Sequence, residues 1–125
     1  MAEERTQYDA GGDNAYHMRP SRVLRKIRAG QIATCFKLNL ADPRAVEIAA
    51  SAGYDCIWLC QEHVPSDNLC LENLVRAAKI YDVDSLVRAP RGSYSDYIRG
   101  FEMDAAAVMV PHVMSEVQAR NGDVV

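Results

Sequence analysis

A glutamate and a histidine stand side by side directly after an apolar run, at Glu62 and His63. The run CIWLC, residues 56–60, has the composition of a buried strand, so we expect the pair at a strand end. Histidine is the side chain best suited to take up a proton near neutral pH, which makes His63 a candidate general base beside a carboxylate. The alternative is that His63 caps the next helix or packs at the rim of the sheet.

An arginine and a second histidine follow two later apolar runs. Arg88 lies in SLVRAP, and cations are rarely placed in an apolar strand without a partner. Its guanidinium could bind a carboxylate or an oxyanion, or it could form a salt bridge to Glu62 at the rim. His112 follows Pro111 and is expected at the same edge of the sheet. A lone histidine there is more often structural, so His112 ranks below His63 and Arg88 as a candidate.

The chain has four cysteines and no apolar signal core at its start, which favours free thiols over disulfides. Cys56 and Cys60 are four residues apart on a predicted strand, roughly 13 Å at about 3.3 Å per residue, which is too far to share one zinc ion. We therefore interpret them as small buried hydrophobic residues. Cys60 has a further possible role, because it ends the strand at a point where a thiol could touch the histidine.

From residue 31 onward, short apolar or β-branched runs alternate with segments of helical spacing. Strands are predicted at 32–38, 55–60, 85–89 and 105–110. Helices are predicted at 23–30, 43–52, 69–81, 93–103 and 115–120. Residues 1–20 are polar and without period, so we predict a flexible tail followed by one partial barrel domain over 21–125.

Nearly continuous apolar strands are typical of a parallel sheet that is covered on both faces, so the fold class is α/β with a repeated βα unit. A TIM (β/α)8 barrel has eight such units and typically about 250 residues, so about four units correspond to its N-terminal half. The other possibility is a small doubly wound open sheet, which the length of 125 residues alone favours. In both architectures, functional groups collect at the carboxyl ends of the strands.

Composition limits the possible partners. The formal net charge is −3 and the 14 Lys and Arg residues are scattered, so we expect no nucleic-acid partner. No apolar run approaches the roughly 20 residues that span a bilayer, so we expect no membrane partner and predict a cytoplasmic location. Hydrophobic residues make up 49% of the chain, which is enough for a packed core.

Four segments in order resemble the HpcH/HpaI aldolase/citrate lyase family, which includes the metal-dependent class II pyruvate aldolases such as 4-hydroxy-2-oxoheptanedioate aldolase. They are LADPRAVEIAASAGYD after the first strand, EHVPSD where the family typically has DGEHAPN, VRAP where it has VRP, and MVPHVMSEVQAR where it has LVPMVQNADEAR. The resemblance runs from about Val23 to Arg120 and keeps the spacing between all four segments.

This resemblance implies the front half of a TIM barrel and a carbon-carbon lyase that cleaves a 4-hydroxy-2-keto acid to pyruvate and an aldehyde. It implies that His63 is the catalytic base and that Arg88 stabilises the developing enolate. Glu62 is implied as a supporting residue. Cys60 and His112, at the same strand ends, are expected from their positions as further supporting or substrate-binding residues. A divalent metal cofactor (Mg²⁺, Mn²⁺ or Co²⁺), a small 2-keto acid substrate, and a homo-oligomer or an association with a missing second half are implied as well.

Two departures limit what carries over from the family. The aspartate that partners the family's histidine is replaced by Cys60, and Gln61 replaces the glycine that follows it. A thiol does not orient an imidazolium as a carboxylate does, so we expect His63 to lack its usual carboxylate partner. The family's metal-binding Glu and Asp come from the second half of the barrel, so no metal ligand is assigned in this chain.

Three hypotheses follow. The first is a lyase half whose active site forms only with the missing strands. The second is a small open-sheet binding module or receiver-like module, which should carry an acidic cluster at its strand ends rather than Lys37, His63 and Arg88. The third is an inactive remnant that self-associates through its open sheet edges, so that two copies close one barrel.

Overall fold

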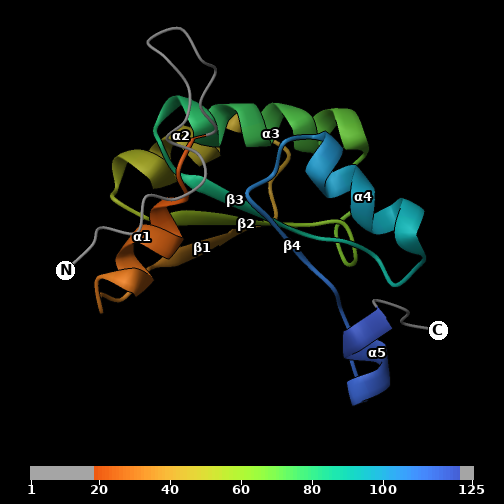
Figure 1. Cartoon of the computed structure of the whole chain (residues 1–125). Helices are drawn as coiled ribbons and strands as arrows, with labels where there is room; N and C mark the ends of the chain where they lie inside the picture. Colours follow the sequence, from red (N-terminus) through yellow and green to blue (C-terminus); the bar gives the residue numbers. More distant parts are fainter. Residues whose placement is uncertain (1–18, 122–125) are drawn as a thin grey trace, which may run out of the picture.

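The computed structural model describes residues 19–121, in which helices and strands alternate along the chain (Figure 1). The helices are α1 (Arg22–Arg28), α2 (Pro43–Ser51), α3 (Asn68–Ile80), α4 (Tyr94–Glu102) and α5 (Glu116–Asn121). The strands are β1 (Cys35–Leu38), β2 (Cys56–Cys60), β3 (Asp84–Arg88) and β4 (Ala107–Met109). The predicted flexible tail, residues 1–20, lies outside the described residues except for Arg19 and Pro20.

Every predicted strand and helix is present, with ends that differ by up to three residues. The largest difference is at β1, which is predicted from residue 32 and begins at Cys35. Pairing with β2 starts at the register pair Cys35 and Cys56, so the residues before Cys35 have no strand beside them. Ile32 is accordingly 86% exposed. An apolar run in a sequence does not reveal where its pairing partner begins.

Two aspartates begin the helices that follow β1 and β2. Asp42 accepts a hydrogen bond from the Arg44 N–H at 3.0 Å, and Pro43 occupies the first turn of α2. Asp67 accepts from the Cys70 N–H at 2.7 Å at the start of α3. Each cap satisfies a backbone donor that the helix itself leaves unpaired, and this fixes where the chain turns back toward the sheet.

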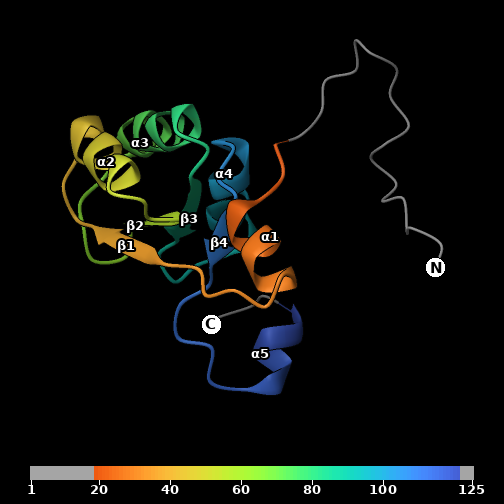
Figure 2. The same ribbon diagram turned by 90° about the vertical axis from the view of Figure 1, so that its left-hand side faces the viewer.

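The four strands form one parallel sheet in the order β1-β2-β3-β4. Helices α2, α3 and α4 lie on the same side of this sheet, as the two views in Figures 1 and 2 show. A doubly wound sheet would reverse its strand order and carry helices on both faces. The sequential order and one-sided cover therefore confirm a partial (β/α) barrel, and the open sheet that chain length favoured is wrong.

The core lies between the sheet and these helices. Leu38, Leu59 and Val87 occupy neighbouring register positions and are all buried, because alternate strand residues point to the same face. Their helical partners in the core include Val46, Leu71 and Val75. At the far end of the sheet α4 comes very close to β4, since a Cβ added at Gly100 would lie 2.5 Å from a methyl carbon of Val108.

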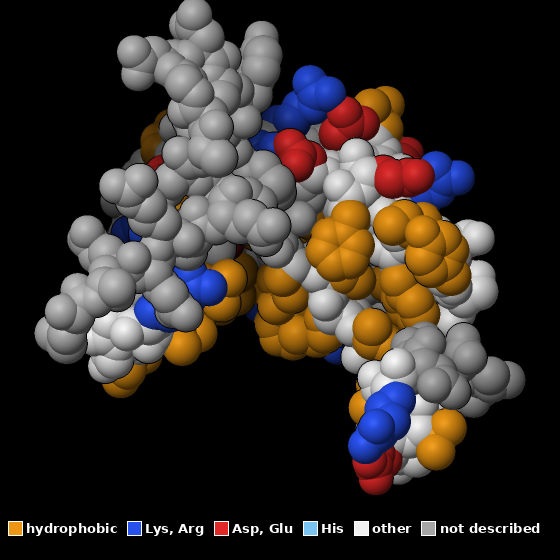
Figure 3. Space-filling view, viewed as in Figure 1, with side chains coloured by type: hydrophobic (Ala, Val, Ile, Leu, Met, Phe, Trp, Pro, Cys, Tyr) orange, Lys and Arg blue, Asp and Glu red, His pale blue; other side chains and the backbone are white. Residues whose placement is uncertain are grey.

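The opposite face of the sheet, here called the inner face, carries the alternate residues of the strands. They are Cys35, Lys37, Cys56, Trp58, Cys60, Asp84, Leu86, Arg88, Ala107 and Met109. Lys37 is exposed, and Trp58 and Leu86 are only half-buried, because α2, α3 and α4 lie on the other side. In a closed barrel this face points toward the interior. In Figure 3 hydrophobic side chains also gather on the outside, over α4 and β4.

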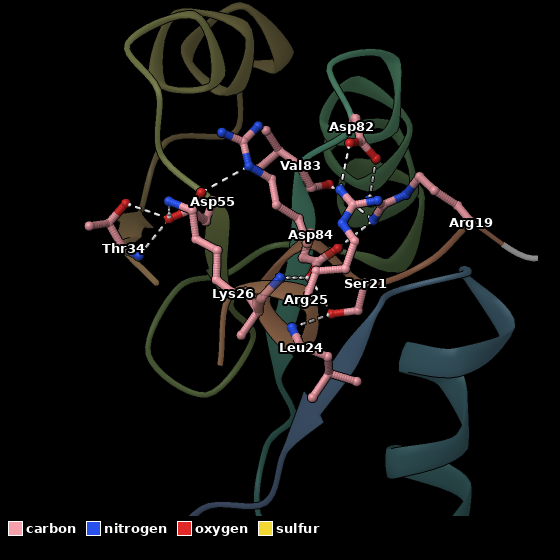
Figure 4. A network of polar contacts seen from close by, with 12 residues as sticks. Arg19, Ser21, Leu24, Arg25, Lys26, Thr34, Asp55, Asp82, Val83 and Asp84 are labelled. Carbon is pink, nitrogen blue, oxygen red and sulfur yellow. Dashed lines mark hydrogen bonds and ion pairs between the residues drawn. The ribbon is translucent and has the colours of Figure 1, made fainter. Parts of the chain in front are cut away.

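Helix α1 lies across the amino-terminal ends of β2 and β3 and is held there by two buried aspartates (Figure 4). Asp55 is fully buried and contacts Arg22 and Lys26, each at 2.8 Å. Burial alone would raise the pKa of Asp55, but the hydrogen bonds from Lys26, Thr34 and Arg22 outweigh it and hold the pKa well below its usual range. Helix α1 is thus fastened at the end of the sheet opposite the candidate site.

Asp84 is the second of these aspartates. It accepts hydrogen bonds from the Ser21 hydroxyl at 2.6 Å and from the Val23 N–H at 2.9 Å, and it pairs with Arg19 at 2.6 Å. Arg19 also contacts Asp82 at 2.8 Å, so this residue of the predicted tail is anchored to the domain. None of the helices described between residues 19 and 121 is both long and apolar enough to span a membrane.

Candidate active site

Five side chains meet at the carboxyl ends of β2, β3 and β4, and we call them the Glu62 cluster. They are Cys60, Glu62, His63, Arg88 and His112. The structure therefore brings together all the site residues that the sequence singles out. This is the edge of the sheet where the loops of a (β/α) barrel build its active sites.

Glu62 is the centre of the cluster and is only 11% exposed at its side chain. Its Oε2 lies 3.1 Å from Nε of Arg88 and 3.2 Å from Nδ1 of His63. Its Oε1 lies 2.5 Å from Nε2 of His112. Both carboxylate oxygens thus face basic nitrogens, and the salt bridge to Arg88 that the sequence suggested as an alternative is present.

Arg88 binds more than the carboxylate. Its Nη2 lies 2.8 Å from Nδ1 of His63 and 3.0 Å from Sγ of Cys60, and its Nε lies 3.3 Å from the same sulfur. Its guanidinium carbon lies 5.1 Å from the centre of the Trp58 ring, within the range of a cation–π interaction. These contacts hold the guanidinium in one orientation over the inner face.

Nδ1 of His63 faces two groups with opposite demands. Arg88 can only donate a hydrogen bond, so Nδ1 must accept, whereas a bond to Glu62 would require Nδ1 to carry the proton. The arginine contact at 2.8 Å is shorter than the glutamate contact at 3.2 Å, so it favours the neutral tautomer with its proton on Nε2. The imidazole is 61% exposed and therefore open to a ligand.

The sequence led us to expect that His63 lacks a carboxylate partner because Cys60 replaces the family's aspartate. The structure instead places the carboxylate of the neighbouring Glu62 next to Nδ1 of His63. Cys60 contacts the backbone N–H of His63 at 3.3 Å rather than its ring. The adjacency of Glu62 and His63 in the chain was the signal for this, since both follow the same strand.

Burial and charge act in opposite directions on Cys60. Burial alone would raise the pKa of its thiol, but hydrogen bonds from Arg88 and from the backbone N–H of His63, the nearby backbone of Glu62 and the charge of Arg88 lower the pKa below its usual value. Cys56, at the other end of the strand, is buried with its pKa raised, first by its contact with Cys35 and then by burial. None of the four cysteines forms a disulfide, as the sequence predicted.

A second cation lies on the inner face beside the cluster. Nζ of Lys37 lies 5.1 Å from the centre of the Trp58 ring, so the indole is flanked by Lys37 and Arg88. Sequence reasoning noted Lys37 only as a strand-end residue and missed Trp58. The signal was the strand period: Trp58 precedes Cys60 by two residues and so faces the same side.

His112 reaches the cluster through an unusual backbone conformation. Its φ is 53°, in the left-handed region that residues other than glycine rarely adopt. Such a conformation typically costs about 1–3 kcal/mol and persists where surrounding contacts enforce it. In this conformation the imidazole of His112 reaches the carboxylate of Glu62.

No protein-family model matches the chain, but individual relatives and structures do. A hydroxypyruvate/pyruvate aldolase of Pseudomonas aeruginosa is 31% identical over 99 residues, covering 79% of this chain and 37% of the relative. A pyruvate aldolase of Rhizobium etli is 32% identical over 96 residues, covering 77% of this chain and 38% of the relative. An HpcH/HpaI aldolase structure from Desulfitobacterium hafniense matches with a TM-score of 0.75 and 30% identity, covering 82% of this chain and 40% of that one. The chain belongs to the HpcH/HpaI aldolase family.

The chain spans about two-fifths of the length of these HpcH/HpaI relatives. Its four βα units therefore correspond to part of the barrel of a family member. The Glu62 cluster lies on the part that the chain contains.

The cluster does not have the character of a metal site. Within residues 19–121, no three His, Cys, Asp or Glu side chains are arranged to hold an ion. Both oxygens of Glu62 face basic groups, and the sulfur of Cys60 is bound by Arg88. A guanidinium at this position repels a divalent cation, so the residues described here do not fit the metal that the family resemblance implies.

Proposed function

We propose that this chain supplies the base and the enolate-binding arginine of an aldehyde-lyase, which cleaves a 4-hydroxy-2-keto acid to pyruvate and an aldehyde. The observation that carries the proposal is the direct contact of His63 with Arg88, at 2.8 Å, at the carboxyl ends of β2 and β3. The fold and the aldolase names of its relatives support the reaction class.

The two residues have the chemical properties that retro-aldol cleavage requires. A base takes the proton of the C4 hydroxyl, the C3–C4 bond breaks as the aldehyde carbonyl forms, and the electron pair passes into a pyruvate enolate. His63 is the proton acceptor and Arg88 stabilises the negative charge on the enolate oxygen or on the adjacent carboxylate. Protonation of the enolate at C3 then gives pyruvate.

For His63 to act as the base through its exposed Nε2, the proton of the imidazole must move to Nδ1. Arg88 prevents this while it donates to Nδ1, and Glu62 would favour it. An anionic substrate that takes over the Arg88 hydrogen bond leaves Nδ1 to pair with Glu62 and frees the lone pair of Nε2. Substrate binding would thus convert His63 into a base.

The charges of the inner face suit an anionic substrate. Arg88 is already matched by Glu62, but Lys37 forms no ion pair within the described part of the chain. Its exposed ammonium group lies close to the Trp58 ring that Arg88 also covers. We propose that Lys37 helps to attract the carboxylate of the 2-keto acid.

The complete site requires groups beyond residues 19–121. A divalent metal (Mg²⁺, Mn²⁺ or Co²⁺) would supply further positive charge beside the enolate. The described residues do not provide its ligands, so we propose that further βα units do so, from a second half-barrel of different sequence. A cytoplasmic location, predicted from the sequence, belongs to the same proposal.

Pyruvate release tests the proposal. A 4-hydroxy-2-keto acid is supplied with Mg²⁺, Mn²⁺ or Co²⁺ to the purified chain, and to the chain co-expressed with the remaining segment of the Pseudomonas aeruginosa relative. We expect turnover that His63→Ala reduces about 10²-fold or more, as loss of a general base does. Arg99→Met is the control, because this exposed arginine pairs with Glu102 on α4, outside the cluster. Metal-dependent turnover that survives His63→Ala would exclude His63 as the base.

A second candidate is a non-catalytic remnant of an aldolase that retains the fold. The observation in its favour is that the described chain provides no metal site while its cluster is internally paired. Absence of turnover in both forms of the assay would support this candidate over the lyase.

A further inference from the structure

The sulfur of Cys60 accepts three hydrogen bonds although the residue is only 2% exposed. Two come from Arg88, from Nε at 3.3 Å and from Nη2 at 3.0 Å. The third comes from the backbone N–H of His63 at 3.3 Å. Among the described residues, no acceptor receives a hydrogen bond from this sulfur in return.

This arrangement suits an anion better than a neutral thiol. A thiol is a weak acceptor, and its own hydrogen needs an acceptor of its own when it is buried. A thiolate has no hydrogen to place, and it gains from every donor and from the guanidinium charge. Three donors converge on one buried sulfur, and two of them belong to the cationic side chain of Arg88. This convergence indicates a negatively charged sulfur.

We propose that Cys60 is a thiolate in the folded chain and that it positions the guanidinium of Arg88 at the carboxyl ends of β2 and β3. The charge state is a property of the chain by itself. The positioning role rests on the proposed function, since it matters for catalysis only if Arg88 binds the enolate or the substrate carboxylate.

The charged groups around the sulfur are consistent with this state. Arg88 faces it from β3, and Glu62 and His63 follow it on the loop after β2. His112, after β4, contacts Glu62 and influences the sulfur only through that carboxylate. The carboxylate of Glu62 opposes a second negative charge, but it is matched by Arg88 and contacted by His112. The lowered pKa of the Cys60 thiol reflects the same balance.

The contacts also explain how the sulfur would orient Arg88. Cys60 and Glu62 both bind Nε, and Cys60 and His63 share Nη2. The remaining nitrogen, Nη1, has no hydrogen-bond acceptor among the described residues. A thiolate therefore fixes one edge of the guanidinium and leaves another donor for an anionic ligand. In this chain, Cys60 would supply the negative charge that an aspartate supplies in the family pattern.

Thiolate absorbance in the ultraviolet tests the charge state. The spectrum of the full chain is recorded from about pH 5 to about pH 10, and that of Cys60→Ser is subtracted, which removes the signals of the other cysteines and of tyrosine. We expect a thiolate difference signal at neutral pH, with a midpoint below the value of about 8.5 for an unperturbed cysteine. A midpoint at or above that value would overturn the proposal.

A second measurement avoids the variant, in case Cys60→Ser does not fold. The wild-type chain is alkylated with iodoacetamide across the same pH range, and Cys60 is followed by mass spectrometry, with Cys70 on α3 as a reference thiol in the same digest. Alkylation is slow for a buried sulfur, but its dependence on pH still reports the thiolate fraction. The same midpoint criterion decides the outcome.

The positioning role is tested by the NMR signal of the Arg88 Nε–H. If Cys60 acted only through packing, variants with and without a negative charge at residue 60 would not differ in this signal. We expect a protected signal in the wild type and in Cys60→Asp, which keeps a negative charge. In Cys60→Ala we expect faster exchange of this hydrogen with water, because only Glu62 remains to hold it. An unchanged signal in Cys60→Ala would overturn the positioning role. None of the three readouts uses turnover, so a failed aldolase assay and a failed thiolate proposal remain distinguishable.

Discussion

Nη2 of Arg88 lies 2.8 Å from Nδ1 of His63. The residue proposed to stabilise the enolate therefore also controls the tautomer of the residue proposed as the base. Glu62, at 3.2 Å from the same nitrogen, favours the opposite tautomer. Because the three groups cannot all form their best hydrogen bonds together, a ligand that binds Arg88 changes the proton position on His63.

This competition predicts a tautomer change that NMR can detect. In the wild-type chain we expect neutral His63 to carry its proton on Nε2, because Arg88 donates to Nδ1. In Arg88→Met the proton should move to Nδ1 and face Glu62. Nitrogen-15 spectra of the labelled chain distinguish the two forms, and Arg99→Met serves as the control. An unchanged His63 tautomer in Arg88→Met would contradict the role of Arg88.

Removing the charge of Glu62 should destabilise the fold, since this nearly buried carboxylate is the common partner of three cationic or basic groups. We expect Glu62→Gln to lower the free energy of unfolding by about 2 kcal/mol, as for hydrogen bonds to charged groups. Urea unfolding measures the change. The control is Glu102→Gln, which breaks an exposed pair with Arg99 and should cost less than about 1 kcal/mol. Equal losses in both variants would mean that the cluster adds no special stability.

The sequence predicted the elements and the site more fully than it predicted the contacts. Apolar periodicity located the strands, and strand ends located His63, Arg88 and His112. Length favoured the wrong architecture, because a residue count does not show strand order. The tautomer competition at His63 and the convergence of donors on Cys60 could not be predicted, since both depend on side-chain directions across the two neighbouring strands β2 and β3.

The buried Asp55 predicts a loss of stability in acid. Burial raises the pKa of Asp55, but the hydrogen bonds from Lys26, Thr34 and Arg22 lower it by a larger amount. The pKa in the folded chain therefore lies below that in the unfolded chain. A depressed folded pKa stabilises the fold above the unfolded pKa of about 3.9, and this contribution is lost as the pH falls from there toward the folded pKa. We therefore expect the free energy of unfolding to drop steeply below about pH 4.

Asp55→Asn should remove part of this dependence. At neutral pH we expect Asp55→Asn to lower the free energy of unfolding by about 3 kcal/mol. This is the lower end of the range for breaking a buried ion pair, because Arg22 and Lys26 remain partly solvated. Below about pH 4 the gap to the wild type should narrow. Asp84 has a depressed pKa as well, so some acid sensitivity should persist. Urea unfolding at several pH values measures both, and Glu116→Gln on α5 is the exposed control. A gap that stays constant with pH would contradict the assigned ionisation of Asp55.

Trp58 is the single tryptophan of the chain and lies between the two cations of the inner face, so its fluorescence should report an anion bound there. We expect pyruvate to change the emission of the wild-type chain. Lys37→Met should weaken pyruvate binding about 10-fold, which corresponds to about 1.4 kcal/mol and to the loss of one hydrogen bond from a charged donor. Lys79→Met is the matched control, because Lys79 lies on α3 and pairs with Asp104. If Lys37→Met binds pyruvate as tightly as the wild type, the 2-keto acid does not use Lys37, and its carboxylate must be bound by Arg88 or by groups outside the described chain.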